Sequence, residues 1–135
     1  MSARNDILNT LVAAVDSSGN FKKVYKGIVP PIPKIKSFPS VAFAISKENR
    51  ERVNVPGCQF QSELHIIGMI YTRADKINYT DEISDLLYAI ENTIQNNANL
   101  NDLVIDIFVK QVAQDGGILY PYSLCELQII AYYRK

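Results

Sequence analysis

The sequence predicts an α+β fold, with a mainly antiparallel sheet and two helices packed on one face of it. Two segments, at residues 4–15 and 80–94, have the apolar spacing of amphipathic helices. Other segments are apolar or alternating over the length of strands, and turn residues separate them. The order helix, strands, helix, strands is typical of this fold class. With 135 residues, 47% of them hydrophobic, the chain is expected to bury one core and to form a single domain over residues 1–135.

The first predicted helix runs from about Arg4 to Val15. Gly19 follows it and can adopt the left-handed backbone on which helices often end. A short strand is expected next, at about residues 21–25. The helix is recognised by one apolar stripe, formed by Ile7, Leu8, Leu11, Val12 and Val15.

Four prolines, Pro30, Pro31, Pro33 and Pro39, then interrupt the chain. Proline lacks a backbone N–H and biases the preceding residue toward extended geometry, so an extended arm is expected here. We interpret it as a stiff connection between strands. A polyproline recognition peptide is the alternative interpretation.

Two strands are expected after the arm, at residues 40–46 and 60–72. The first has apolar residues on both faces and should be buried. The charged segment Lys47–Arg52 is expected to leave the sheet, and Pro56-Gly57 predicts a turn. The second strand has one apolar face, formed by Leu64, Ile66 and Ile70.

The second helix has Thr80 as its predicted N-cap, and the Asn-rich residues 96–101 should end it. Its buried face is expected to comprise Ile83, Leu86, Leu87, Ile90 and Ile94. Its outer face is acidic throughout, with Asp81, Glu82, Asp85 and Glu91.

Two more strands close the chain. One face of the first should carry Leu103, Ile105, Ile107 and Val109, and one face of the second Cys125, Leu127, Ile129, Ala131 and Tyr133. Two helices cover only one face of a sheet, yet the opposite face would carry Val104, Phe108, Val112, Ile130 and Tyr132. That is more apolar than a solvated face usually is. A neighbouring subunit or the folded-back Pro-rich arm would each explain it.

Charge balances overall but not along the chain. Residues 22–52 contain eight basic residues against two acidic ones, a net charge of +6, and residues 75–115 show the reverse, −6. Such halves suit a subunit whose one side meets the other side of a copy of itself. Pairing of the two halves within the monomer and binding of nucleic acid are the alternatives.

Residues that could carry catalysis are scarce. His65 is the single histidine, and Glu63 lies two residues before it on the same predicted strand, so a His–carboxylate pair is geometrically possible. A lone histidine on the polar side of a strand is more often a surface or interface residue. Without a C-x-x-C motif no zinc site is expected, and Cys58 and Cys125 are interpreted as reduced thiols. We therefore predict no enzyme, no catalytic, cofactor-binding or metal-binding residues, and no cofactor.

Nucleic-acid binding has slightly more support in the sequence. Lysines interleave with aromatic residues over Phe21, Lys22, Lys23, Tyr25, Lys26, Lys34, Lys36 and Phe38. Against it stand a net charge of zero, a pI near 6.6 and the absence of a known nucleic-acid-binding module. No run approaches the roughly 20 apolar residues of a membrane span, so a soluble protein is expected.

The elements together carry a family resemblance over most of the chain. They are the helix Ile7–Val15, the Pro-rich segment ending in Phe38-Pro-Ser-Val41, the strand Glu63–Ile67, the helix Ile83–Ile94, the strand Val104–Val112 leading to Asp115-Gly-Gly117, and the strand Leu127–Tyr132. In this order they resemble the tail terminator (tail completion) proteins of long-tailed bacteriophages. The resemblance lies in the pattern of elements and involves no diagnostic motif.

The resemblance implies a virion structural protein that assembles in the host cytoplasm and lies at the head–tail junction. It would form a ring, as a homohexamer, that caps the tail tube, stops its polymerisation and provides the surface joining head or neck. Its partners would be its own copies, the tail tube protein and a neck or connector protein. DNA would pass through the lumen without specific binding, and no membrane would be involved. A neck or head-completion protein, or a small nucleic-acid-binding protein, is the alternative.

Two groups of residues are the interface candidates. Lys47, Arg50 and Arg52 belong to the charged segment, which would dock on a neighbouring copy or on the tube. A solvated hairpin tip is the alternative for this segment. Phe108, Ile130 and Tyr132 belong to the opposite sheet face, which a neighbour in a ring would cover.

Overall fold

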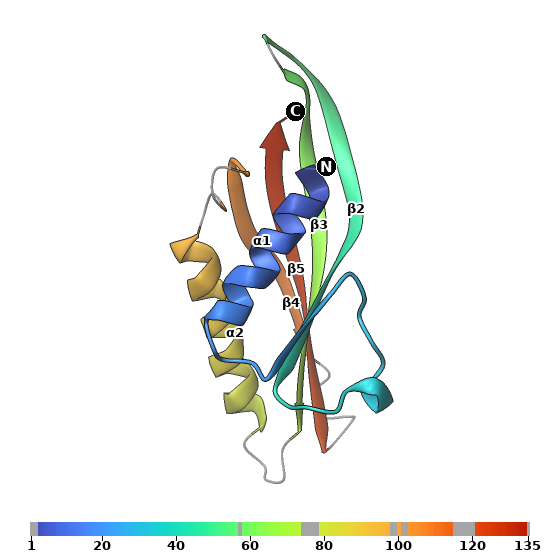
Figure 1. The fold of residues 1–135 in the computed structure, drawn as a ribbon, viewed down its shortest axis with the longest axis vertical. Coiled ribbons are helices and arrows are strands. Elements are labelled where there is room, and N and C mark those ends of the chain that lie inside the picture. Colours follow the sequence, from blue (N-terminus) through green and yellow to red (C-terminus); the bar gives the residue numbers. More distant parts are fainter. Residues whose placement is uncertain are drawn as a thin grey trace.

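The computed structural model describes residues 3–56, 58–73, 79–97, 100, 103–114 and 121–134. In it, five strands form a sheet in the order β1-β2-β3-β5-β4, with both helices on one face (Figure 1). The elements are α1 (Ala3–Ser17), β1 (Lys23–Lys26), the short 3₁₀ helix η1 (Ile32–Lys34), β2 (Ser40–Val55), β3 (Cys58–Arg73), α2 (Tyr79–Asn96), β4 (Asp106–Gln114) and β5 (Tyr122–Arg134). Strand β1 pairs with β2 in parallel and all other pairs are antiparallel. The predicted fold class is confirmed.

The main core lies between the helices and the sheet. Helix α1 buries Ile7, Leu8, Leu11 and Val15 there, and α2 buries Ile83, Leu86, Ile90 and Ile94. Both predicted helix stripes are thus confirmed, with Val12 and Leu87 half-buried beside them. Alternate residues of β3 and β5 complete the core, among them Leu64 and Cys125. The side chain of Cys58 lies outside the described residues, so its thiol state stays a prediction.

The helix ends differ little from the predicted ones. Gly19 follows α1 with φ of +76°, the left-handed conformation expected of it. Helix α2 begins at Tyr79, one residue before the predicted N-cap Thr80, whose side chain lies outside the described residues. At the other end the Asn97 side chain donates a hydrogen bond of 2.9 Å to the Thr93 carbonyl, as expected for an Asn-rich helix stop.

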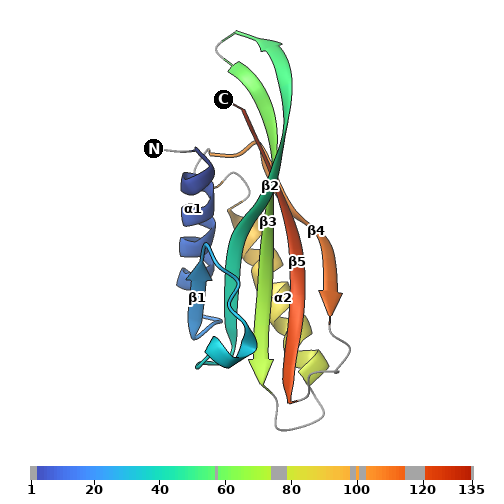
Figure 2. The same ribbon diagram turned by 90° about the vertical axis from the view of Figure 1, so that its right-hand side faces the viewer.

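Strands β2 and β3 form a long hairpin that projects beyond the helices (Figures 1 and 2). The prediction that residues 47–52 leave the sheet is wrong, because β2 continues through them to Val55. A strand ladder is built by backbone hydrogen bonds, so the charged side chains of residues 47–52 do not end it. Ser46 is an extra residue, a β-bulge between the pairs Ile45–Ile66 and Lys47–His65.

Strand β4 begins later than predicted. Ladder pairing starts at Asp106, three residues after Leu103. Ile105 is 56% exposed in the bend before the strand, and Val104 is buried in the main core. The alternation predicts Val104 on the opposite sheet face and Ile105 on the core face. Both predictions are wrong, because the two residues precede the strand.

A bulge at Lys110 then reverses the alternation of β4. Val109 pairs with Ile129, but Gln111 pairs with Gln128, so Lys110 has no direct partner in the ladder. Val112 consequently pairs with Leu127, whose side chain lies in the main core. The prediction that Val112 lies on the opposite face is wrong for this reason, since regular alternation does not allow for a bulge.

The Pro-rich arm folds over one end of the opposite sheet face. Ile35 is buried there against Ala42 and Tyr71. The Tyr71 hydroxyl donates a hydrogen bond to the Pro30 carbonyl, and burial raises the pKa of Tyr71 to about 12. The folded-back arm, one of the two explanations considered, thus accounts for part of the apolar opposite face.

Candidate protein-interaction site

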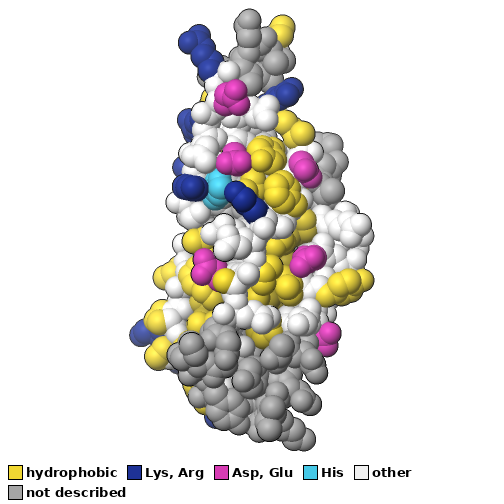
Figure 3. Space-filling model, turned by 180° about the vertical axis from the view of Figure 1, so that it is seen from behind, with side chains coloured by type: hydrophobic (Ala, Val, Ile, Leu, Met, Phe, Trp, Pro, Cys, Tyr) yellow, Lys and Arg dark blue, Asp and Glu magenta, His cyan; other side chains and the backbone are white. Residues whose placement is uncertain are grey.

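An aromatic patch, which we define as Phe108, Ile130 and Tyr132, lies on the opposite face outside the cluster that the arm forms. Phe108 and Ile130 are direct partners across β4 and β5. The rings of Phe108 and Tyr132 are stacked, with centroids 6.1 Å apart and planes at 30°. Ile130 is 1% exposed, whereas Phe108 is 37% exposed. Figure 3 shows a hydrophobic stripe along this face, bordered by charged side chains. The patch is therefore an apolar surface whose side chains already hold fixed positions.

A polar cluster around Glu63 fixes one end of the aromatic patch. The Tyr132 hydroxyl donates to Glu63 Oε1 at 2.9 Å, the Asn49 amide donates to Oε2 at 3.1 Å, and His65 Nε2 lies 2.9 Å from Oε2. The hydrogen bonds from His65, Asn49 and Tyr132, in that order, lower the pKa of Glu63 to about 2. The His–carboxylate pair that the sequence allowed is present, and its carboxylate orients Tyr132.

A second cluster lies on the helix side, where the hairpin leaves the body of the molecule. The Glu48 side chain is 7% exposed and accepts hydrogen bonds of 2.9 Å from the Ser62 and Tyr133 hydroxyls. Arg4 Nε of α1 lies 3.2 Å from Glu48 Oε1, and Arg50 also donates to this carboxylate. Burial raises the pKa of Glu48, but the hydrogen bonds from Arg50, Tyr133 and Ser62 outweigh it and leave this pKa below 4.5. The cluster joins α1, β2, β3 and β5.

The structure separates the three basic interface candidates. Lys47 pairs with His65, which pairs with Ile130, so Lys47 lies in one cross-strand row with the aromatic patch. Arg50 lies on the helix side and is engaged within the chain, because its guanidinium contacts Glu48 and lies 4.4 Å from the centroid of the Phe60 ring. Arg52 is exposed and pairs with Phe60.

The two clusters differ in what the sequence revealed of them. Glu63 was recognised as a possible partner of His65, because it lies two residues before the single histidine on the same side of a strand. Glu48 was missed, because only the bulge at Ser46 turns it toward the helices, opposite Leu64.

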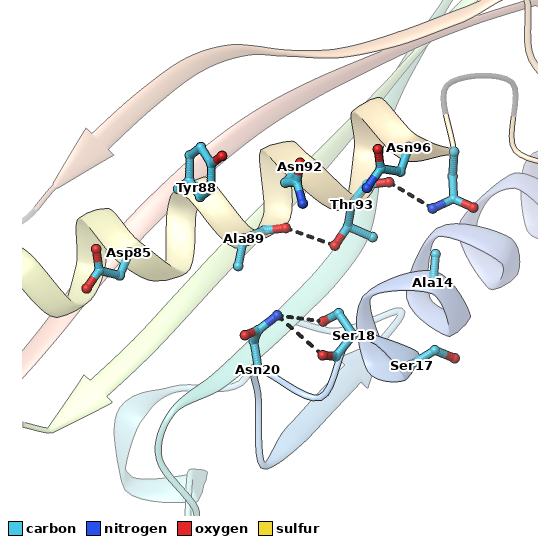
Figure 4. Close-up of a pocket in the computed structure, with 11 residues that line it drawn as sticks. Ala14, Ser17, Ser18, Asn20, Asp85, Tyr88, Ala89, Asn92, Thr93 and Asn96 are labelled. Atoms are coloured by element: carbon cyan, nitrogen blue, oxygen red, sulfur yellow. Dashed lines mark hydrogen bonds between the residues drawn. The ribbon is translucent and has the colours of Figure 1, made fainter.

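A groove of about 660 Å³ lies between α2 and the end of α1 (Figure 4). Its lining is mainly Ser, Asn and Thr side chains, with Asp85 as the charged residue. Part of the lining is engaged locally: Asn20 donates to Ser18 Oγ at 3.1 Å, and Thr93 donates to the Ala89 carbonyl at 2.8 Å. The groove thus lacks a convergent set of reactive groups and is a shallow polar surface.

Two searches of the described residues gave negative results. They contain no group of three or more His, Cys, Asp or Glu side chains placed to hold a metal ion. None of the helices in the described part of the chain has the length and apolar composition to cross a membrane.

The exposed aromatic patch is of the kind found where proteins contact one another. A scan against family models matches residues 1–135 to the family described as Bacteriophage Tail Tube Terminator Protein. The chain therefore belongs to this family, whose members are structural virion components and not enzymes. The predicted resemblance and the predicted absence of enzymatic function are confirmed by this membership.

The other comparisons are more distant. A search of curated proteins finds no match. Among solved structures, a chain of the "Virion of native gene transfer agent (GTA) particle" is similar at 12% sequence identity and a TM-score of 0.42. The match covers 93% of this chain and 84% of that chain. The family assignment rests on the family model alone.

Proposed function

We propose that this protein forms a homohexameric ring on the end of the phage tail tube, stops tube polymerisation, and provides the surface that joins the head or neck. The observation that carries this proposal is the family match over residues 1–135. In the virion the ring would lie at the head–tail junction, and DNA would pass through its lumen without specific binding. Such a role needs several separate protein-contacting surfaces on one small chain.

The aromatic patch, together with Lys47, is the surface that we assign to the tube protein. Phe108 is exposed and stacked on Tyr132, which Glu63 in turn holds by a hydrogen bond. A fixed aromatic side chain with charged residues around it is typical of the residues that dominate interface energetics. Because these side chains are already ordered, binding would cost little conformational entropy.

Replacement of Phe108 tests the tube contact. Tube protein polymerised with the wild type should give tubes of limited length carrying density at one end, visible by negative-stain microscopy. Phe108→Ser should weaken binding to tube ends about tenfold or more, the effect of losing ~1.4 kcal/mol of contact, and tubes should grow longer. Val112→Ser is the matched control, because Val112 lies in the same strand, is 39% exposed and faces the helix side. Equal effects of the two substitutions would rule out the patch as the tube surface.

The mass and shape of the purified protein test the ring itself. Sedimentation equilibrium should show a hexamer at high concentration, and negative-stain images should show closed rings. A protein that stays monomeric at every concentration and never binds tube ends would contradict the proposed function. Binding to the connector with no affinity for tube ends would instead support the neck or head-completion alternative.

A further inference from the structure

Charged residues gather at opposite edges of the sheet. Residues 21–40, which include β1 and the arm, contain five lysines and no acidic residue. Residues 77–109, which include α2 and the start of β4, contain six acidic residues and no basic one. The strand order places β1 and β4 at the two ends of the sheet, and Figures 1 and 2 show the arm beside β1 and α2 beside β4. The lysines of β1 and the arm and the acidic residues of α2 and β4 therefore lie at two different edges of the molecule.

We name these surfaces by their described residues. The basic edge comprises Lys22, Lys23, Lys26, Lys34 and Lys36 with Ile28. The acidic edge comprises Glu82, Asp85, Glu91 and Asp106 with Tyr88 and Ile105. Among the described residues, no ion pair joins a side chain of either edge to another part of the chain. Pairing of the two halves within the monomer, one of the sequence interpretations, is therefore absent from the described part of the chain.

Each edge also exposes apolar side chains among its charges. Ile28 of the basic edge is 61% exposed, and Tyr88 of the acidic edge is 71% exposed. Asp85, Tyr88 and Glu91 follow one another at intervals of three residues on α2, so the tyrosine lies between the two carboxylates. Exposed large apolar side chains ringed by charge are characteristic of protein contact surfaces.

We propose that the basic edge of one copy docks on the acidic edge of the next copy. The proposal deepens the proposed function and rests on it, since it names the surfaces through which copies would join in the ring. A contact between two different surfaces is the kind that closes into a ring. A two-fold contact would instead place like charges opposite each other at either edge, which is unfavourable. The charge of each edge is therefore complementary to that of the other edge and not to that of the same edge on a second copy.

Two charge-reversal variants test this contact. Lys22→Glu/Lys23→Glu lowers the charge of the basic edge from +5 to +1, and Asp85→Lys/Glu91→Lys changes the charge of the acidic edge from −4 to zero. All four side chains are exposed, so the core is unaffected. Lys26 is left unchanged because its Nζ donates to Asn9 Oδ1 at 2.8 Å. Each variant alone would lose most of the attraction between its own two edges, which should weaken self-association about tenfold or more in sedimentation equilibrium.

Mixing the variants separates a lost contact from a damaged fold. In an equimolar mixture the unchanged basic edge of one variant meets the unchanged acidic edge of the other, so pairs of the two variants should form through one wild-type contact. The chain carrying all four substitutions keeps neither edge and should self-associate no better than either variant alone. Arg73→Glu/Arg134→Glu is the matched control for the basic-edge variant, because it makes the same change in net charge at exposed positions of β3 and β5 outside both edges and should assemble like the wild type.

The outcomes distinguish this inference from the proposed function. If each of the two variants alone assembles like the wild type, or if their mixture shows no recovery of association, the edge contact is overturned. Neither result would overturn the ring or its binding to the tube. A wild type that neither self-associates nor binds tube ends would overturn both. DNA binding is the remaining outcome. If the wild type is retained on DNA in a salt-sensitive way, and the Lys22→Glu/Lys23→Glu variant loses this retention while its self-association is unchanged, then the basic edge is a nucleic-acid surface and the contact is overturned.

Discussion

Glu48 and Glu63 lie on opposite sides of the β2–β3 hairpin, and each carboxylate accepts hydrogen bonds from three side chains. Glu63 orients Tyr132 of the aromatic patch, whereas Glu48 anchors the base of the hairpin to α1 through Arg4. At this scale the sequence predicted which residue types could pair, as with Glu63 and His65. It did not predict the Glu48 cluster, because a bulge decides the side on which that residue lies.

Removal of the Glu48 carboxylate should destabilise the fold. Glu48→Ala leaves the Ser62 and Tyr133 hydroxyls without their acceptor and the Arg4 guanidinium without its ion-pair partner, which should cost about 2 kcal/mol. The measurement is urea unfolding followed by circular dichroism. Glu51→Ala is the control, because Glu51 is exposed on the same strand and its loss should cost no more than about 0.5 kcal/mol. Similar losses in both variants would show that the Glu48 cluster has no special stabilising role.

Among the elements, β2 and β3 are joined by an aromatic–glycine pair that sets their close packing. Gly68 of β3 pairs with Phe43 of β2, and a Cβ on Gly68 would lie 3.0 Å from Phe43 Cε1. Phe43 is fully buried, so its ring has little freedom to move aside. The ring covers the glycine backbone, an arrangement known to strengthen glycine-containing strands.

A methyl group at Gly68 should therefore be destabilising. Gly68→Ala is expected to cost about 1–2 kcal/mol through overpacking, measured by thermal or urea unfolding. In a Phe43→Leu background the smaller side chain leaves room, so the same substitution should cost less there. The double-mutant cycle gives the coupling between the two positions. A cost that is identical in both backgrounds would contradict the proposed steric cause.

The elements themselves were predicted unequally. Both helices were recognised because long stripes of apolar residues such as Ile7–Val15 repeat over several turns. The strands were located, but β2 continues past the bulge at Ser46 where it was expected to end, and in β4 the predicted faces hold only for Ile107 to Val109, between the bend at Ile105 and the bulge at Lys110. A bulge is a single unpaired residue that has no characteristic residue type, so a regular alternation of faces along the sequence does not reveal it.

For the molecule as a whole, the two glutamate clusters predict a loss of stability in acid. The pKa values of Glu48 and Glu63 both lie below 4.5 in the folded state, and that of Glu63 is about 2. Each carboxyl group therefore binds protons more tightly when the chain is unfolded. The stability that they contribute is fully present above about pH 4.5 and is lost as the pH falls toward 2.

Urea unfolding at a series of pH values measures this loss. The free energy of unfolding should decline as the pH is lowered from about 4.5 to 2, and Glu63→Gln should reduce the slope because it removes one of the two titrating groups. Gln111→Glu is the control, because it adds a carboxyl group at an exposed position of β4 and should leave the slope close to that of the wild type. An unchanged slope in Glu63→Gln would contradict the conclusion that the lowered pKa of Glu63 contributes to the loss of stability in acid.

The candidate surfaces also depend on the whole molecule. Segregation of charge was visible in the sequence, as the net charges of residues 22–52 and 75–115 show. That the lysines of residues 22–36 and the described acidic residues of α2 and β4 lie at opposite edges follows from the strand order β1-β2-β3-β5-β4, in which the last two strands exchange places. The aromatic patch was predicted in part, because Phe108, Ile130 and Tyr132 lie on the opposite face whereas Val104 and Val112 do not.

The bulge at Ser46 also limits how the hairpin can change in length during evolution. Neighbouring residues of a strand face opposite sides, so one residue inserted between Ser46 and Glu48 would turn Glu48 away from the helices. Residues added at the tip in equal numbers on the two strands would leave every pair and every side chain below them unchanged. Family members should therefore differ at the tip by equal numbers of residues on the two strands, and the reach of the hairpin could vary while its base stays the same.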